Sequence, residues 1–278
     1  MTSTTHTQVI HDYYTESGEH IVSRDVTIGH VGKWLKNGWL DMAHAPLASL
    51  FYGAVMMFSV MAVYSVFHNQ PIMMFKIATF FVMLTPFLAT GLYAISAQLH
   101  RGQPPQLRQS MFVWRHNVTE FALFALFLGV VVAIWGRIVP LIAAIAQSDS
   151  LLIVNPEQGV MSFLTSDAGQ IFTGYFFVGA LAVSALIFAL SVVTIPLLLR
   201  DRNIGFVQAM ILSFKTTMHN KGVMLVWALT IGALITIGML SLGLGMLIVM
   251  PLLGYASWHA FCDLIEVDDK RQNDEIEI

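Results

Sequence analysis

Six apolar stretches, each long enough to cross a lipid bilayer, constrain this chain more than any other feature of its sequence. They occupy residues 46–67, 72–99, 117–147, 171–199, 222–241 and 242–265. A helix of about 20 apolar residues spans the hydrocarbon core of a bilayer. Composition agrees, because 56% of the 278 residues are hydrophobic and only 11% are charged, against about 25% charged residues in soluble domains. The sequence therefore predicts an all-α, polytopic membrane helix bundle.

Lys and Arg are confined almost entirely to alternate connections between the predicted spans. They occur before residue 46, within residues 100–116 and 200–221, and after residue 265. The opposite connections hold neither, apart from Lys76 and Arg137 near span ends. Because connections rich in Lys and Arg stay in the cytoplasm, we expect six transmembrane helices with both termini cytoplasmic.

The two ends of the chain are expected to lie outside a membrane domain of residues 26–266. Residues 1–25 combine low hydrophobicity with no periodicity, which predicts a disordered cytoplasmic tail. They also lack the apolar segment of a cleavable signal. Residues 267–278 form an acidic cytoplasmic tail.

Residues 26–44 have the period of an amphipathic helix. Polar residues, among them Asp41, take one face. The apolar face carries Val31, Trp34, Leu35, Gly38 and Met42. Tryptophans beside basic residues are typical of helices in the lipid headgroup layer, so Trp34, Trp39 and Trp114 are expected to be interfacial anchors. The alternative is a short helix that packs on another part of the protein.

The spans and their preceding amphipathic segments recur as three similar units. Aligning Trp39, Ser110 and Ser213 also aligns Pro46, Asn117 and Asn220, seven residues later, where each outgoing span begins. We therefore expect three helical hairpins, each preceded by a cytoplasmic interfacial helix. The alternative is chance similarity, since any six-span protein with amphipathic loops shows some such matches.

The segment 251–263 concentrates the residues that lipid-facing helices seldom carry. His259 and Asp263 are four residues apart, hence on one helix face and within reach of each other, with Trp258 beside them. An ionisable pair at this depth is a functional candidate, as a proton-coupled or ligand-gated switch or as a haem or metal ligand. The favoured interpretation is a structural hydrogen bond that fixes the helix end. Pro86, Pro196 and Pro251 are candidate hinges.

Enzyme chemistry has no support in the sequence. It contains no GxSxG motif, no Gly-rich phosphate loop and no carboxylate pair in a polar segment. Its single cysteine, Cys262, excludes an internal disulfide and a Cys-based zinc site. A haem or metal ion held by His259 needs a second ligand from His44, His100, His116 or His219. We therefore predict no catalytic residues, no metal and no cofactor.

Four segments resemble the DUF2189 family, a bacterial family of predicted integral membrane proteins. The resemblance runs from about residue 25 to residue 266, and its carriers are residues 34–41, 91–105, 196–202 and 251–263. The last segment is the most specific, although the family pattern has a basic residue where this chain has Cys262. The resemblance implies a fold and no particular chemistry.

These observations predict a non-enzymatic bacterial inner-membrane protein. The expected role is an accessory, assembly or scaffolding component of a larger membrane complex. One alternative is a transporter or channel for a small or lipid-like solute, and a second is a haem-binding redox protein. Expected partners are membrane lipids and subunits of such a complex. The net charge of −3 gives no reason to expect nucleic acid.

Overall fold

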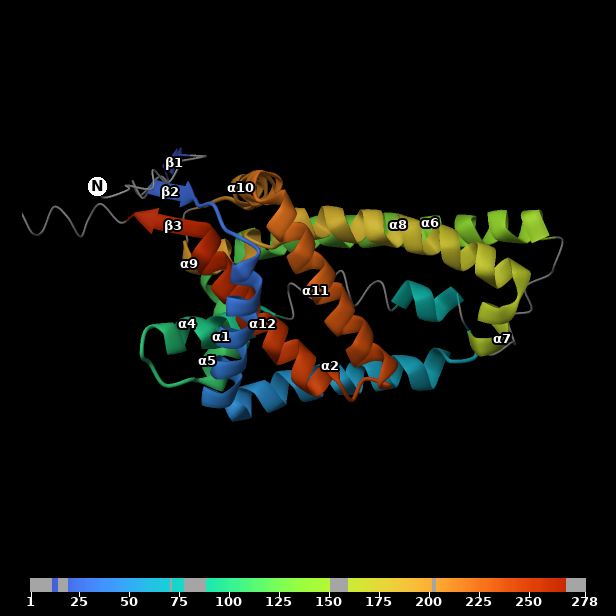
Figure 1. Cartoon of the computed structure of the whole chain (residues 1–278), viewed down its shortest axis with the longest axis horizontal. Coiled ribbons are helices and arrows are strands. Elements are labelled where there is room, and N and C mark those ends of the chain that lie inside the picture. The colour runs from blue at the N-terminus through green and yellow to red at the C-terminus, as the bar shows by residue number, and fades with distance from the viewer. Residues whose placement is uncertain are drawn as a thin grey trace, which may run out of the picture.

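The computed structural model describes residues 12–14, 20–70, 72–77, 89–150, 160–201 and 204–268. Helices make up most of this part of the chain (Figure 1). The first half contains α1 (Gly29–His44), α2 (Pro46–Phe67), α4 (Thr90–His100), α5 (Leu107–Met111), the 3-10 helix η1 (Val113–Asn117) and α6 (Val118–Ser150). The second half contains α7 (Val160–Thr165), α8 (Asp167–Ser191), α9 (Thr194–Arg200), α10 (Phe206–His219), α11 (Lys221–Leu240) and α12 (Met246–Leu264).

Five helical stretches are long and apolar enough to cross a membrane: Pro46–Phe67, Val118–Ala146, Asp167–Arg200, Lys221–Leu240 and Met246–Leu264. They coincide with five of the six predicted spans, which confirms an all-α, multi-pass membrane protein. Within the remaining predicted span, residues 72–77 and 90–100 are helical, and residues 78–88 lie outside the described residues. The last span begins at Met246, because residues 241–245 form the turn after α11.

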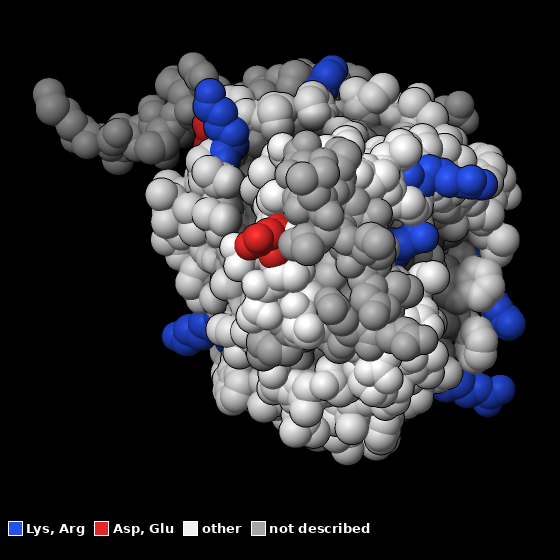
Figure 2. Space-filling view, turned by 90° about the vertical axis from the view of Figure 1, so that its right-hand side faces the viewer, with Lys and Arg blue, Asp and Glu red and all other residues white. Residues whose placement is uncertain are grey.

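The long helices define the long axis of the molecule. α6 and α8 run side by side along it, and α2 follows the opposite edge (Figure 1). α1, α10 and the strands lie at one end of these helices, and α7 lies at the other (Figure 1). Figure 2 views the α7 end, where uncharged residues make up most of the described surface, acidic side chains lie near the centre, and Lys and Arg lie mostly toward the sides.

α12 is the central helix of the bundle. It contacts α1, α2, α4 and α11, and 67% of its span is buried, against 11 to 28% for the other four. Two glycines allow neighbouring helices to approach its backbone. A Cβ on Gly53 of α2 would lie 2.3 Å from the carbonyl oxygen of Leu247, and one on Gly38 of α1 would lie 2.8 Å from the backbone nitrogen of Ala256. Among the five spans of the described residues, the one with the lowest hydropathy is therefore the most enclosed.

Two of the three prolines proposed as hinges lie in the described structure. Pro196 follows a break, because α8 ends at Ser191, residues 192–193 form a turn, and α9 begins at Thr194. Proline lacks the N–H that would bond the carbonyl four residues earlier, here that of Val192. Pro251 lies buried inside α12, which continues through it. Pro86 lies outside the described residues.

The expected order of a short helix followed by a long one occurs three times: α1 with α2, η1 with α6, and α10 with α11. Each short segment contacts the helix that returns from the preceding unit. α5 and η1 contact α4, α10 contacts α8 and α9, and α1 contacts α12, the returning helix of the last unit. The contact of α1 with α12 therefore joins the beginning of the helical region to its end.

The structural equivalent of Ser110 and Ser213 is Gly38 rather than Trp39. Gly38, Ser110 and Ser213 each lie eight residues before the first residue of the long helix that follows, at Pro46, Val118 and Lys221. All three are buried. The sequence alignment was therefore one residue out of register in the first unit.

The chain before α1 and the chain after α12 pair as strands. β1 (Asp12–Tyr14), β2 (His20–Ser23) and β3 (Ile265–Asp268) form an antiparallel sheet in that order. The prediction of a disordered tail over residues 1–25 was therefore wrong for these strands, and residues 267–268 of the predicted acidic tail belong to β3. Three-residue and four-residue strands give little periodicity in sequence, and their pairing joins residues far apart in the chain.

Arg24 fastens this sheet to the end of α12. Its amide donates to the Leu264 carbonyl at 2.9 Å, and its guanidinium pairs with the Glu266 carboxylate. The hydrogen bond from Arg24 lowers the pKa of Glu266 from its ordinary 4.5, while partial burial opposes the shift.

Acid should therefore loosen the pairing of β2 with β3. Because the pKa of Glu266 is depressed in the folded state, its stabilising contribution is present above pH 4.5 and is lost as the pH falls through the lowered value. We expect the Arg24 amide to lose hydrogen-exchange protection over that range, after correction for intrinsic exchange rates. The Glu266→Gln variant should lack this pH dependence, and an unchanged profile in the variant would assign the effect to other groups.

Candidate functional site

His259 and Asp263 lie one turn apart near the end of α12, and each bonds to α1 rather than to the other. His259 Nε2 lies 2.9 Å from Asp41 Oδ2. The indole Nε1 of Trp34 donates to Asp263 Oδ2 at 2.9 Å. The sequence predicted that these two residues bond to each other, and the structure gives each of them a partner on α1 instead.

The Asp41 cluster, made of Asp41, Ser96 and His259, joins three helices. Ser96 of α4 is fully buried, and its hydroxyl donates to the same Asp41 oxygen that faces His259. The side chains of Asp41 and His259 are each 15% exposed. One carboxylate on α1 therefore binds α4 and α12 together, and the contact becomes an ion pair when His259 is protonated.

Asp41 was placed on the polar face of its helix by sequence reasoning, and that placement was wrong. It lies three residues after Gly38 and seven after Trp34, both of which are buried against the protein. Residues at these spacings share one face of a helix. The spacing was therefore a usable signal, but the charge of Asp41 outweighed it.

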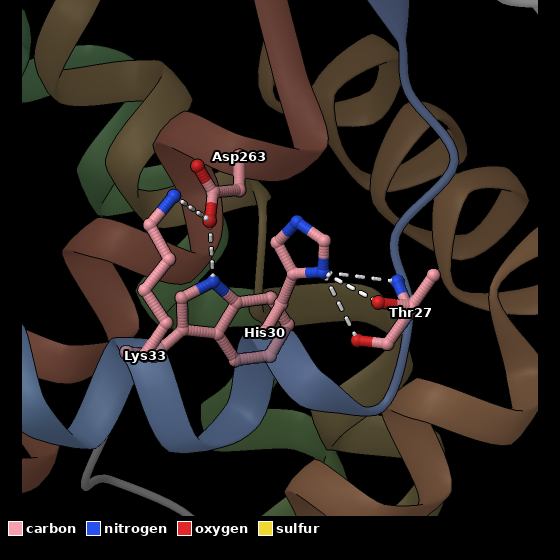
Figure 3. A network of polar contacts seen from close by, with 5 residues as sticks. Thr27, His30, Lys33 and Asp263 are labelled. Atoms are coloured by element: carbon pink, nitrogen blue, oxygen red, sulfur yellow. Dashed lines mark hydrogen bonds and ion pairs between the residues drawn. The ribbon is translucent and has the colours of Figure 1, made fainter.

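The Asp263 cluster, made of Lys33, Trp34 and Asp263, lies one helical turn away. Lys33 points toward the Asp263 carboxylate, with Nζ 3.7 Å from Oδ2 (Figure 3). Trp34 is fully buried and packs edge-on against Trp227 of α11, with ring centroids 5.5 Å apart. Trp34 is therefore not an interfacial anchor, because its indole fills the contact between α1, α11 and α12.

The other predicted tryptophans divide by exposure. Trp258 is buried and packs against Phe261 at 5.4 Å between ring centroids, so it does not lie at an exposed membrane boundary. Trp39 is 53% exposed and Trp114 is 41% exposed, and their role as interfacial anchors stays a prediction.

Several polar contacts between helices were not foreseen from the sequence. Glu120 Oε2 of α6 accepts from the amide of Phe206 at 2.6 Å and so satisfies the first N–H of α10. The hydroxyls of Ser49 and Tyr255 lie 3.0 Å apart, which links α2 to α12. Asn220 accepts from the Val26 amide and donates to the Arg24 carbonyl, both at 3.1 Å. These contacts join residues distant in sequence, which single-chain periodicity does not pair.

Metal or haem ligation was the alternative role for His259. Across the described residues, no group of three His, Cys, Asp or Glu side chains gathers as a metal site. His44 bonds the Leu40 carbonyl at 2.7 Å, and His219 bonds Asp25 at 2.5 Å. His259 itself faces Asp41. The contact of His259 with Asp41 is a polar contact between α12 and α1.

The middle of the chain matches a known protein family. Residues 72–200 match the model of the DUF2189 family, described as a predicted integral membrane protein. A search of curated proteins found no match, and neither did a search of solved structures. The matched region runs from the helical residues 72–77 to the end of α9. The resemblance to the DUF2189 family of predicted integral membrane proteins is therefore confirmed for the middle of this chain.

Proposed function

We propose that this protein is a non-enzymatic component of the bacterial inner membrane and serves as an accessory, assembly or scaffolding subunit of a larger membrane complex. The main support is that the ionisable residues of α12 bond to another helix of the same chain. His259 and Asp263 both bond to α1, so they hold the bundle together. Ionisable residues inside a span commonly mark a transport or proton pathway, and here the same residues have structural partners.

The expected topology has six spans in three hairpins, with both termini and the interfacial helices in the cytoplasm. Its support is the distribution of charge. The segments that join the long helices at the end near β2 and α1 carry several basic residues. These are Arg24, Lys33, Arg101, Arg108 and Lys215. The excess of basic residues at one end favours a cytoplasmic location for that end. Reporter fusions at residues 1, 155 and 278 test this: only the fusion at 155 should report the periplasm.

The packing of α12 also favours a scaffold over a transporter. A transporter needs a binding site for its solute among its helices. Instead, α12 approaches α1 and α2 at backbone distance through Gly38 and Gly53, and Leu92 of α4 lies against Gly254. Large apolar side chains point outward on the long helices, among them Leu47, Val178 and Leu240, which are 71%, 72% and 79% exposed. That outer surface suits lipid or a partner helix.

The test is purification of the full chain in native nanodiscs, followed by protein and lipid mass spectrometry and an absorbance spectrum. A partner that stays at fixed stoichiometry through gel filtration is the expected result, and it would identify the complex. A partner-free protein that carries a defined solute would favour transport, which solute flux in liposomes would then measure against the His259→Ala and Asp263→Ala variants. A Soret band would overturn the proposal in favour of a haem protein.

A further inference from the structure

The segment from Leu107 to Val118 is apolar on its outer surface. Met111, Phe112, Trp114 and Val118 are 40%, 40%, 41% and 49% exposed. The same segment is fixed to the bundle from its inner side, because the Ser110 hydroxyl is buried and lies 2.8 Å from the Tyr52 hydroxyl of α2. The outward apolar side chains therefore belong to a fixed surface at the start of α6.

A guanidinium group lies close to two aromatic rings in this segment. Arg115 lies over the Phe112 ring, 4.3 Å from its centroid, and 5.8 Å from the centroid of Trp114. The Trp114 indole is itself oriented by a hydrogen bond from Nε1 to the Met111 carbonyl at 3.2 Å. A guanidinium stacked on a ring keeps its N–H edge available for a phosphate, which it binds with two parallel hydrogen bonds.

The charged residues of this segment are all basic. Residues 100–117 contain Arg101, Arg108 and Arg115 and no Asp or Glu. The next carboxylate along the chain, Glu120, accepts from the Phe206 amide. Aromatic residues with adjacent Arg, placed where a span begins, have the composition that binds an anionic lipid surface.

We propose that Phe112, Trp114 and Arg115 form a binding site for an anionic phospholipid. The rings lie at the boundary of the acyl chains and headgroups, and the Arg115 guanidinium binds the lipid phosphate. The site requires only that the chain is embedded in a membrane and is independent of the accessory role proposed above.

The experiment is a lipid titration of the delipidated full chain in detergent, read by native mass spectrometry. The probes are dioleoyl phosphatidylglycerol and, for comparison, dioleoyl phosphatidylcholine. The wild type should prefer the anionic lipid. Arg115→Gln should bind it about fivefold more weakly, the effect of one basic residue near a charged surface. Arg115→Lys keeps the positive charge but loses the planar guanidinium group. Its affinity for phosphatidylglycerol should lie between those of the wild type and Arg115→Gln. The comparison is Lys36→Gln, an exposed lysine on α1, which should weaken phosphatidylglycerol binding less than Arg115→Gln does.

Equal binding of the two lipids by the wild type would overturn the proposal, as would an Arg115→Gln variant that binds phosphatidylglycerol like the wild type. Inorganic phosphate is then added as a competitor of the bound phosphatidylglycerol. Its failure to displace the lipid is expected, because the rings supply part of the binding. Displacement at equal concentration would show a site for the free anion, and would also overturn the proposal. Arg115 is exposed, so the variants should keep the wild-type circular dichroism spectrum.

Discussion

Gly38→Ala should destabilise the protein, whereas Gly32→Ala on the same helix should stabilise it. A Cβ at Gly38 would lie 2.8 Å from the Ala256 nitrogen and 2.8 Å from the Leu252 carbonyl oxygen, both of them backbone atoms of α12. Backbone atoms cannot turn aside as a side chain does, so α1 must move away from α12. Overpacking of this kind costs about 1–3 kcal/mol.

Gly32 supplies the matched control. A Cβ there meets nothing within 4 Å, so alanine should contribute only its helix preference of about 0.5–1 kcal/mol over glycine. Thermal unfolding of the purified chain in detergent, followed by intrinsic fluorescence, measures both variants. We expect melting temperatures on opposite sides of the wild type. A rise in both variants would show that α1 does not lie at backbone distance from α12.

Trp34→Ala should strongly destabilise the protein. Trp34 is fully buried, packs on Trp227 and donates to Asp263. Truncating a buried tryptophan to alanine costs about 3–5 kcal/mol through lost burial and the cavity left behind. Trp34→Phe should cost less, because it keeps much of the ring packing and removes the hydrogen bond to Asp263.

Trp39→Ala is the comparison, since Trp39 lies five residues later on α1 and is 53% exposed. Its stability should change by about 0.5 kcal/mol or less. Thermal unfolding in the same detergent ranks the three variants. Similar losses for Trp34→Ala and Trp39→Ala would mean that both tryptophans lie at the membrane boundary, as the sequence alone predicted.

The spans could be predicted from sequence because bilayer thickness imposes a length on them. The first predicted span, residues 46–67, coincides with α2 at both ends. The strands at the two ends of the chain could not be predicted in this way. β2 and β3 are four residues each, and their pairing joins the beginning of the membrane domain to its end.

The sequence composition located the candidate site correctly. The partners predicted for its residues were wrong, because they were chosen from neighbours in the sequence. His259 and Asp263 stood out because lipid-exposed spans seldom carry ionisable residues. Their spacing of four residues made them each other's nearest partner in sequence. Asp41 and Trp34 became their partners only because α1 folds back across α12, and Gly38 permits that approach. The amphipathic pattern of α1 was correct, but it does not say whether lipid or protein covers the apolar face.

Polar contacts hold α1 against α12, and a double-mutant cycle on Asp41 and His259 tests this most directly. Asp41→Asn, His259→Gln and the double variant are compared by their free energies of unfolding in detergent. Contacting residues typically show coupling of about 0.5–3 kcal/mol, and we expect a value in that range because the two side chains lie 2.9 Å apart and are each 15% exposed. The control cycle pairs His259→Gln with Lys36→Gln, which should be additive. Additive effects of Asp41→Asn and His259→Gln would contradict the fastening of α1 to α12 by this pair.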